Sequence, residues 1–302
     1  MRGSLETAGA GTVAAAGNRP AQYLALTKPD VSFLVVMTTV AGYALGTVGP
    51  LNWLGMAHTV FATTLIAAGT SALNHYVERD SDARMRRTAS RPLPSGQLQP
   101  DEALWFGMGL VVVGTIYLAL AANPLATMLG IFTSLAYLCV YTPLKRKTTL
   151  ATLIGAIPGA VPPLIGWAAA RGSLNADAGI LFAVLFLWQF PHFDAIAWIY
   201  REDYARAGIR MLPVVDLDGR RTFREIVVTA ALLVPVSLLP ALTGLAGMRY
   251  FFGAIVLGVM LVEMCLWSAA SKNNVRAKWL MHATVLHLPL LLGLLIYDKF
   301  AR

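Results

Sequence analysis

The sequence contains few charged residues and almost no cysteine. Only 13% of its 302 residues are Asp, Glu, Lys or Arg, while 57% are hydrophobic, and this balance excludes an ordinary soluble enzyme of such length. Two cysteines, Cys139 and Cys265, both fall in hydrophobic segments, so neither a disulfide framework nor a cysteine metal site is expected. We expect both to be core residues of a polytopic membrane protein.

Nine hydrophobic runs are long enough to cross a bilayer, which takes about 20 apolar residues. The expected fold is all-α, with nine transmembrane helices in a bundle around a central cavity. Residues 1–20 lack the apolar core of a signal peptide and are expected to be a disordered tail, whereas residues 21–302 form a single transmembrane domain. The expected spans lie near 31–48, 53–77, 104–121, 124–143, 150–170, 178–200, 226–246, 250–270 and 279–297.

Acidic residues are scarcer than basic ones, which leaves a net charge of +8. With a cytoplasmic N-terminus, nine spans put 20 of the 24 Lys and Arg residues on the cytoplasmic face, as the positive-inside rule requires. The excess charge therefore indicates topology and an anionic ligand. Nucleic acid is excluded as a partner, because it would require a soluble basic face.

A polar cluster ends the second hydrophobic run. Asn74, Glu78 and Asp82 recur every four residues and therefore share one helical face. Two carboxylates and an amide stacked in this way favour a cation between them, and hard oxygen ligands suit Mg²⁺. Asp80 lies off this face, and its role stays open.

Basic residues follow the acids in a Pro-rich and Gly-rich loop that includes Arg87 and Arg91, and Lys145 lies on the same predicted face. A second polar interruption, 201–224, carries Glu202 and Asp203 four helices later and suggests a weak internal repeat. Acids, cations and an apolar cavity together suit an isoprenoid diphosphate, because Mg²⁺ bridges carboxylates to phosphate oxygens while Arg and Lys take the remaining charge.

Several motifs resemble the intramembrane UbiA-type prenyltransferase superfamily. Asn74-x3-Glu78-x3-Asp82, followed by Arg87-Thr-x-x-Arg91-Pro-Leu-Pro-Ser-Gly, is similar to its first signature, with Glu78 where Asp is more usual. Four further segments resemble its protohaem IX farnesyltransferase branch, as does His75, over roughly residues 22–298. They are Leu26-Thr-Lys-Pro29, Pro162-Pro-Leu-Ile-Gly-Trp167, Trp188-Gln-Phe-Pro-His192-Phe and Asp203-Tyr-x-x-Ala-Gly208-Ile-x-Met-Leu-Pro213.

The resemblance implies transfer of a farnesyl group from farnesyl diphosphate to the vinyl group of haem B, giving haem O. It implies a bacterial inner membrane with the active-site face cytoplasmic, and haem A synthase as a further partner beside the lipid bilayer. The resemblance implies Mg²⁺ as cofactor, with metal ligands that also count as catalytic groups: Asn74, Glu78, Asp82 and Asp203. It implies Tyr141 as a further catalytic group. The substrate-binding residues that it implies are Arg87, Arg91, Lys145 and His192.

Two alternatives stay open at this point. One is prenylation of another acceptor, a quinone precursor or chlorophyllide, and the other is a polytopic transporter, since ionisable residues at membrane depth mark ion pathways. Against transport, the ionisable residues gather on one rim. The roles of Asp194 and Glu202 are open, and His282 and His287 are alternative haem ligands to His192.

Overall fold

The protein is built from helices and their connections. A computed structural model describes residues 18–301, and these contain no β-strand. The helices are α1 (Arg19–Leu26), α2 (Pro29–Gly46), α3 (Trp53–Asp82), α4 (Pro100–Ala121), α5 (Pro124–Leu135), the π-helix η1 (Ala136–Tyr141), α6 (Thr142–Leu144), α7 (Ala151–Gly159), α8 (Pro162–Arg171), α9 (Ala176–Ile199), α10 (Arg201–Arg206), α11 (Leu212–Val215), α12 (Arg220–Leu242), α13 (Met248–Ser271) and α14 (Asn274–Phe300).

Nine segments of residues 18–301 are long and apolar enough to cross a membrane, which confirms the expected all-α, nine-span fold. Seven are single helices, and the other two are composite: Pro124–Leu144 joins α5, η1 and α6, and Ala151–Arg171 joins α7 and α8. Helix α1 begins at Arg19, so residues 19 and 20, which were expected to belong to the disordered tail, are helical. Residues 1–17 of that tail lie outside the described residues.

Proline explains the break between α7 and α8. Pro158 lies inside α7, and Pro162 and Pro163 begin α8. Each proline lacks a backbone donor and disfavours helical geometry in the residue before it, so the fifth span cannot run as one straight helix. Gly159 at the end of α7 leaves room for a side chain of α9, because a methyl group there would overlap Gln189 Oε1. Gln189 donates to the Ala156 carbonyl oxygen at 3.0 Å.

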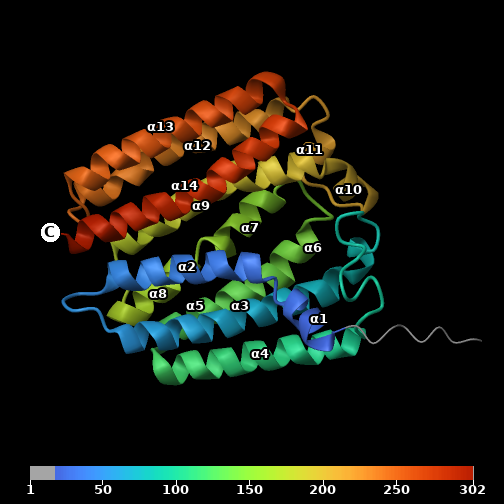
Figure 1. Ribbon diagram of the computed structural model, residues 1–302, viewed down its shortest axis with the longest axis horizontal. Helices are drawn as coiled ribbons and strands as arrows, with labels where there is room; N and C mark the ends of the chain where they lie inside the picture. The colour runs from blue at the N-terminus through green and yellow to red at the C-terminus, as the bar shows by residue number, and fades with distance from the viewer. Residues whose placement is uncertain (1–17, 302) are drawn as a thin grey trace, which may run out of the picture.

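The helices form two groups that lie side by side (Figure 1). Helices α2, α3, α4, α5 and α8 make one group, with extensive packing of α3 on α4 and of α2 on α8. Helices α9, α12, α13 and α14 make the other. The largest buried apolar cluster, which includes Trp167 and Trp188, spans both groups and holds them together.

Close helix packing between α2 and α8 depends on glycine. A methyl group added at Gly166 would overlap the Thr39 carbonyl oxygen and lie 2.6 Å from the Tyr43 nitrogen, and one added at Gly42 would overlap the Pro163 backbone. Small residues allow two backbones to approach within the membrane, where packing rather than water exclusion drives association. This contact holds the second half of α2 against α8, while the first half of α2 lines one wall of the central cavity.

At one end of the bundle, the two long polar interruptions meet. Met85 of the first packs in one buried cluster with Ala207 and Met211 of the second and with Ala197 of α9. We call these two segments, residues 83–99 and 200–219, the two caps. Because they contact each other directly, they cover a single region of the bundle end.

The expectation for the cysteines is only half right. Cys265 is buried in α13, but Cys139 is exposed on η1. The sequence placed Cys139 in a hydrophobic run, which does not distinguish a lipid-facing position from a core position.

We predict that Gly166→Ala lowers the stability of the protein by about 2 kcal/mol, because the added methyl group must push α2 and α8 apart. Gly179→Ala is the matched control: Gly179 is also helical, and a methyl group there meets nothing within 4 Å. Thermal unfolding of the purified protein in detergent measures both. Equal melting temperatures for the two variants would contradict the packing argument.

Candidate functional site

The end of α3 presents three oxygen-bearing side chains, and each is paired with a cation from another segment. Asn74 Oδ1 accepts a hydrogen bond from Lys28 Nζ at 2.7 Å. Glu78 Oε1 lies 3.0 Å from Lys145 Nζ. Asp82, which is 1% exposed, lies 2.7 Å from Arg91 Nη1. The expected repulsion between the acids is therefore relieved by the protein's own cations.

Lys28 is the site residue that the sequence analysis missed. In the sequence it stands within Leu26-Thr-Lys-Pro29, and the structure turns its side chain toward Asn74. The turn between α1 and α2 gives Lys28 a φ of 46°, a left-handed conformation that is uncommon outside glycine. Burial, together with Arg91 and Lys145, lowers the pKa of Lys28 to about 7, although Glu78 and Asp82 raise it. The only signal in the sequence was a lone lysine before a proline at the start of a membrane span.

Lys145 lies over an aromatic surface made by the π-helix. Its Nζ is 4.5 Å from the centre of the Tyr141 ring and 5.8 Å from that of Tyr137. A π-helical turn shifts the register of the side chains that follow it, and such turns are frequent at functional sites. Burial lowers the pKa of Lys145, but Tyr141 and Glu78 outweigh it and hold that pKa well above the usual value. Lys145 is accordingly a permanent cation.

The Tyr141 ring is held by a glycine on the next span. A methyl group at Gly155 of α7 would lie 2.6 Å from the ring, so only glycine permits the ring to occupy this position. The tyrosine that the resemblance singled out therefore has a fixed place beside Lys145.

Asp203 of α10 joins the first cap to the second. Its two carboxylate oxygens accept hydrogen bonds from the backbone nitrogens of Arg86 and Arg87, at 3.2 and 3.3 Å, and Arg206 makes an ion pair with it. Its neighbour Glu202 is exposed. Asp203 thus ties the loop that carries Arg87 and Arg91 to the far side of the site.

The Arg87 side chain, which comes from the first cap, packs on tyrosines of the second cap and does not pair with the acids of α3. Its guanidinium is 4.5 Å from the centre of the Tyr200 ring and 5.7 Å from that of Tyr204. Cation–π contacts of this kind hold a guanidinium without neutralising it. Arg87 therefore keeps its charge for another anion.

His192, Asp194 and Asp80 lie apart from the cation–acid cluster. His192 is packed between α9 and α14, where its Nδ1 is 2.8 Å from Thr284 Oγ1 and its ring stacks on Trp188. Asp194 is fully buried and accepts from Thr152 Oγ1 at 3.2 Å. The Asp80 side chain is 75% exposed.

One histidine on α3 does lie beside the site. His75 follows Asn74 and is 2% exposed, and neither of its ring nitrogens has a hydrogen-bond partner among the described residues. Unpaired polar groups at this depth are costly. Its neighbour Asn74 is nevertheless fully engaged, donating to Thr142 Oγ1 at 3.4 Å in addition to accepting from Lys28.

A cavity of about 270 Å³ opens between the two helix groups, and it meets this cluster at Lys28. Lys28, Tyr137 and Tyr141 line it, and a hydrogen-bonded pair, Thr70 and Ser134, adds two hydroxyl groups. Most of the remaining wall is apolar, with side chains from α2, α3, α7 and α9. Its size is of the order of a small-ligand pocket. A ligand here would have an anionic head near Lys28 and an apolar body in the cavity.

The donor set fits a divalent cation that arrives with an anionic ligand. No three Asp, Glu, His or Cys side chains within residues 18–301 converge as a ready-made metal site. Mg²⁺ is commonly held by one or two carboxylates together with substrate phosphates. Glu78 and Asp82, with the amide oxygen of Asn74, provide oxygens of that kind on one helix face.

Comparison with known proteins gives the family. Residues 35–288 match the sequence model of the UbiA prenyltransferase family. A curated protein of Solibacter usitatus named protoheme IX farnesyltransferase is 49% identical over 286 residues, which cover 92% of this chain and 98% of that protein. The protein of the same name from Koribacter versatilis is 45% identical over 92% of this chain and 93% of its own length.

Solved structures show the same fold at low sequence identity. A digeranylgeranylglyceryl phosphate synthase superposes with a TM-score of 0.77 at 18% identity, covering 94% of this chain and 99% of that one. A UbiA homolog from Archaeoglobus fulgidus, solved with DMAPP and Mg²⁺, gives a TM-score of 0.60 at 15% identity over 91% of this chain and 99% of that one.

We predict that Arg91→Met lowers the free energy of unfolding by about 2 kcal/mol, because it leaves the buried Asp82 carboxylate without its cation. The value lies below that of a fully buried pair since the Arg91 side chain is 27% exposed. Arg19→Met is the control: it removes the exposed pair with Glu102, for which a change within about 1 kcal/mol is expected. Thermal unfolding in detergent measures both, and equal losses would show that Asp82 does not depend on Arg91.

Proposed function

This chain belongs to the UbiA prenyltransferase family, and we propose that it transfers a farnesyl group from farnesyl diphosphate to a vinyl group of haem B (protohaem IX), giving haem O. The relatives at 49% and 45% identity, both named protoheme IX farnesyltransferase, support this choice of donor and acceptor over a quinone precursor or chlorophyllide. The gathering of ionisable groups at one end of the bundle supports transfer chemistry over transport.

One observation carries the proposal: the cation–acid cluster of α3 adjoins an apolar cavity, and the two share Lys28. Lys28 belongs to both, since it binds Asn74 and lines the cavity. Tyr141 also belongs to both, since it lines the cavity and contacts Lys145. An isoprenoid diphosphate has this division, with a strongly anionic head and a hydrocarbon body.

The diphosphate would be bound by cations that already converge on the site. Lys28, Lys145 and Arg91 come from three different segments and now contact the side-chain oxygens of α3. Arg87, held on Tyr200 and Tyr204, can reach the same head without losing an acidic partner. These donors favour the leaving diphosphate over the bound ester, because its charge increases as the carbon–oxygen bond breaks.

Asn74, Glu78 and Asp82 would hold Mg²⁺, with Asp203 on the opposite cap as the fourth predicted ligand. When bound, Mg²⁺ supplies positive charge to the oxygens of the leaving group. The chain's own contribution is to hold these carboxylates in place through their pairs with Lys145, Arg91 and the backbone of Arg86 and Arg87.

The reaction balances without an oxidant. The carbon–oxygen bond breaks with its electron pair on the diphosphate, and the allylic cation is attacked by the vinyl carbon of haem. Water then adds to the resulting cation and loses a proton, which leaves a hydroxyethylfarnesyl group. The rings of Tyr137 and Tyr141 line the cavity, where a π-face stabilises a cation. The dry cavity wall delays water until the carbon–carbon bond has formed.

The active site would face the cytoplasm of a bacterial inner membrane. The positive-inside pattern and the bacterial relatives support this orientation. His192 remains a predicted haem-binding residue, although it does not line the cavity. Haem A synthase remains a predicted partner, because an enzyme that acts on the porphyrin of haem O would consume the product within the same bilayer.

We predict that Glu78→Gln and Asp82→Asn each reduce haem O formation at least about a hundredfold, because each removes a carboxylate that positions the diphosphate and its metal. Asp80→Asn is the control, since its side chain is exposed and off the shared face. Purified variants are incubated with haem B, farnesyl diphosphate and Mg²⁺, and the hydroxyethylfarnesyl adduct is measured by mass spectrometry. A chelator should abolish the wild-type product. Near-wild-type activity of either carboxylate variant would reject the assigned site, and absence of the adduct from the wild-type reaction would reject the proposed function.

A second prediction concerns topology. With nine spans and a cytoplasmic N-terminus, alkaline phosphatase fused after Arg302 should be exported and active in a bacterial host, because an odd number of crossings puts the two chain ends on opposite faces. The same reporter fused after Lys147, between the fourth and fifth spans, should be inactive. The reverse pattern would invert the proposed orientation.

A further inference from the structure

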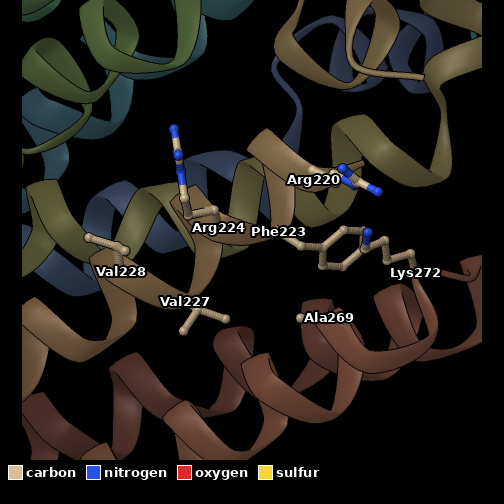
Figure 2. A pocket seen from close by; sticks show the side chains of 7 residues that line it. All are labelled: Arg220, Phe223, Arg224, Val227, Val228, Ala269 and Lys272. Atoms are coloured by element: carbon tan, nitrogen blue, oxygen red, sulfur yellow. The ribbon is translucent and has the colours of Figure 1, made fainter. Parts of the chain in front are cut away.

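A second concave site lies outside the cavity, between the first turns of α12 and the end of α13. It is a groove of about 310 Å³ on the outer surface of the helix bundle (Figure 2). Arg220 begins α12 directly after the second cap, so the groove is at the same end of the bundle as the candidate site. It is lined by Arg220, Phe223, Arg224, Val227, Val228, Ala269 and Lys272.

The end of the groove nearest the cap is cationic. Figure 2 shows the Arg220 and Lys272 side chains close to the Phe223 ring, while Arg224 extends from α12 on the side away from α13. The Arg224 side chain donates no hydrogen bond and forms no ion pair within residues 18–301. Three cations thus border one groove, and the function proposed above employs none of them.

This end of the groove already holds one anionic group. The Arg220 backbone nitrogen donates to Asp218 Oδ1 at 3.1 Å, its Nε lies 3.1 Å from Asp218 Oδ2, and Lys272 Nζ donates to the Asp218 carbonyl oxygen at 3.3 Å. The Arg220 backbone hydrogen bond is the main cause that lowers the pKa of the Asp218 carboxyl. The position therefore attracts negatively charged oxygens, as expected at a helix N-terminus flanked by cations.

The other end of the groove is apolar and belongs to the membrane-spanning part of the helices. Val227 and Val228 lie within the seventh span, and Val228 is 48% exposed. Exposed Trp267 and Trp279 lie near the same ends of α13 and α14, and Arg276 stacks on Trp267 at 4.5 Å. Tryptophan with basic residues marks the boundary between hydrocarbon and headgroups. The groove therefore crosses that boundary, with cations on the headgroup side and valines on the hydrocarbon side.

We propose that this groove binds an anionic phospholipid of the surrounding bilayer, with its phosphate at Arg220 and Lys272 and an acyl chain along Val227 and Val228. Charge complementarity selects an anionic headgroup, and basic pockets between transmembrane helices bind such lipids. The apolar half, which continues into the membrane span, selects a lipid over a soluble phosphate. The proposal is independent of the prenyl transfer reaction. A lipid bound at Arg220 would lie next to the second cap, because Arg220 directly follows that cap.

The test compares two double variants that each remove two cations. The groove variant, Arg220→Gln with Lys272→Gln, removes the two cations proposed to bind the phosphate. The control variant, Arg221→Gln with Lys278→Gln, removes two exposed cations that do not line the groove. Each protein is purified in detergent and mixed with equal amounts of phosphatidylglycerol and phosphatidylcholine of identical acyl chains. Native mass spectrometry then measures the ratio of the two lipids bound.

We expect the wild-type protein to prefer phosphatidylglycerol, and the groove variant to lose about fivefold of that preference per cation removed. The control variant should keep the wild-type ratio. Equal binding of both lipids by the wild-type protein, or the same loss in both variants, would overturn the proposal. Displacement of the lipid by glycerol 3-phosphate at equal concentration would also overturn it, because the anion alone would then be the ligand.

Two more variants keep the test decisive if the first fails to insert. Asp218→Asn removes the anion that already occupies Arg220 and should increase the preference for phosphatidylglycerol by up to about fivefold. Arg220→Lys with Lys272→Arg keeps both charges and should keep the wild-type ratio. A lower preference in Asp218→Asn would contradict the proposed position of the phosphate.

Discussion

The structure depends on the pairing of α3 with cations that come from elsewhere in the chain. Asn74, Glu78 and Asp82 lie at the buried end of a membrane-spanning helix, where an unpaired carboxylate is costly. Lys28, Lys145 and Arg91 satisfy them from the start of α2, the end of the fourth span and the first cap. These three contacts oblige three separate segments to meet at one point. They also ensure that the cations are in place before any anionic ligand arrives.

The caps and the cavity follow from that meeting point. The first cap is held down by Arg91 on Asp82, and it offers two backbone nitrogens to Asp203 of the second cap. Helix α2 is held against α8 by glycine contacts, and its first residues then form one wall of the cavity beside Lys28. The polar and apolar parts of the site are thus fixed by different forces. Charge pairing in a low-dielectric setting positions the head of the ligand, and close packing of small residues shapes the space for its body.

The sequence predicted the nine spans well because length and hydropathy are local properties. It also predicted the face shared by Asn74, Glu78 and Asp82, since helical periodicity requires only their spacing. Lys28 was missed because its side chain reaches the site through a left-handed turn, which no pattern of spacing reveals. The structure packs His192 against Trp188 and Thr284, and its part in haem binding stays a prediction. Its motif identified the family without indicating which way the ring faces.

The sequence by itself determined the membrane-embedded class, the number of spans, the clustering of charge at one end and the acidic face of α3. Each of these follows from composition or from periodicity within one element. Tertiary structure alone decided which cation neutralises which oxygen, that Asp203 binds the backbone of the opposite cap, and that Arg87 lies on tyrosines rather than on the acids. It also decided that Arg220 and Lys272 border one groove. Such contacts join residues far apart in the chain, and they depend on how whole helices pack rather than on any local pattern.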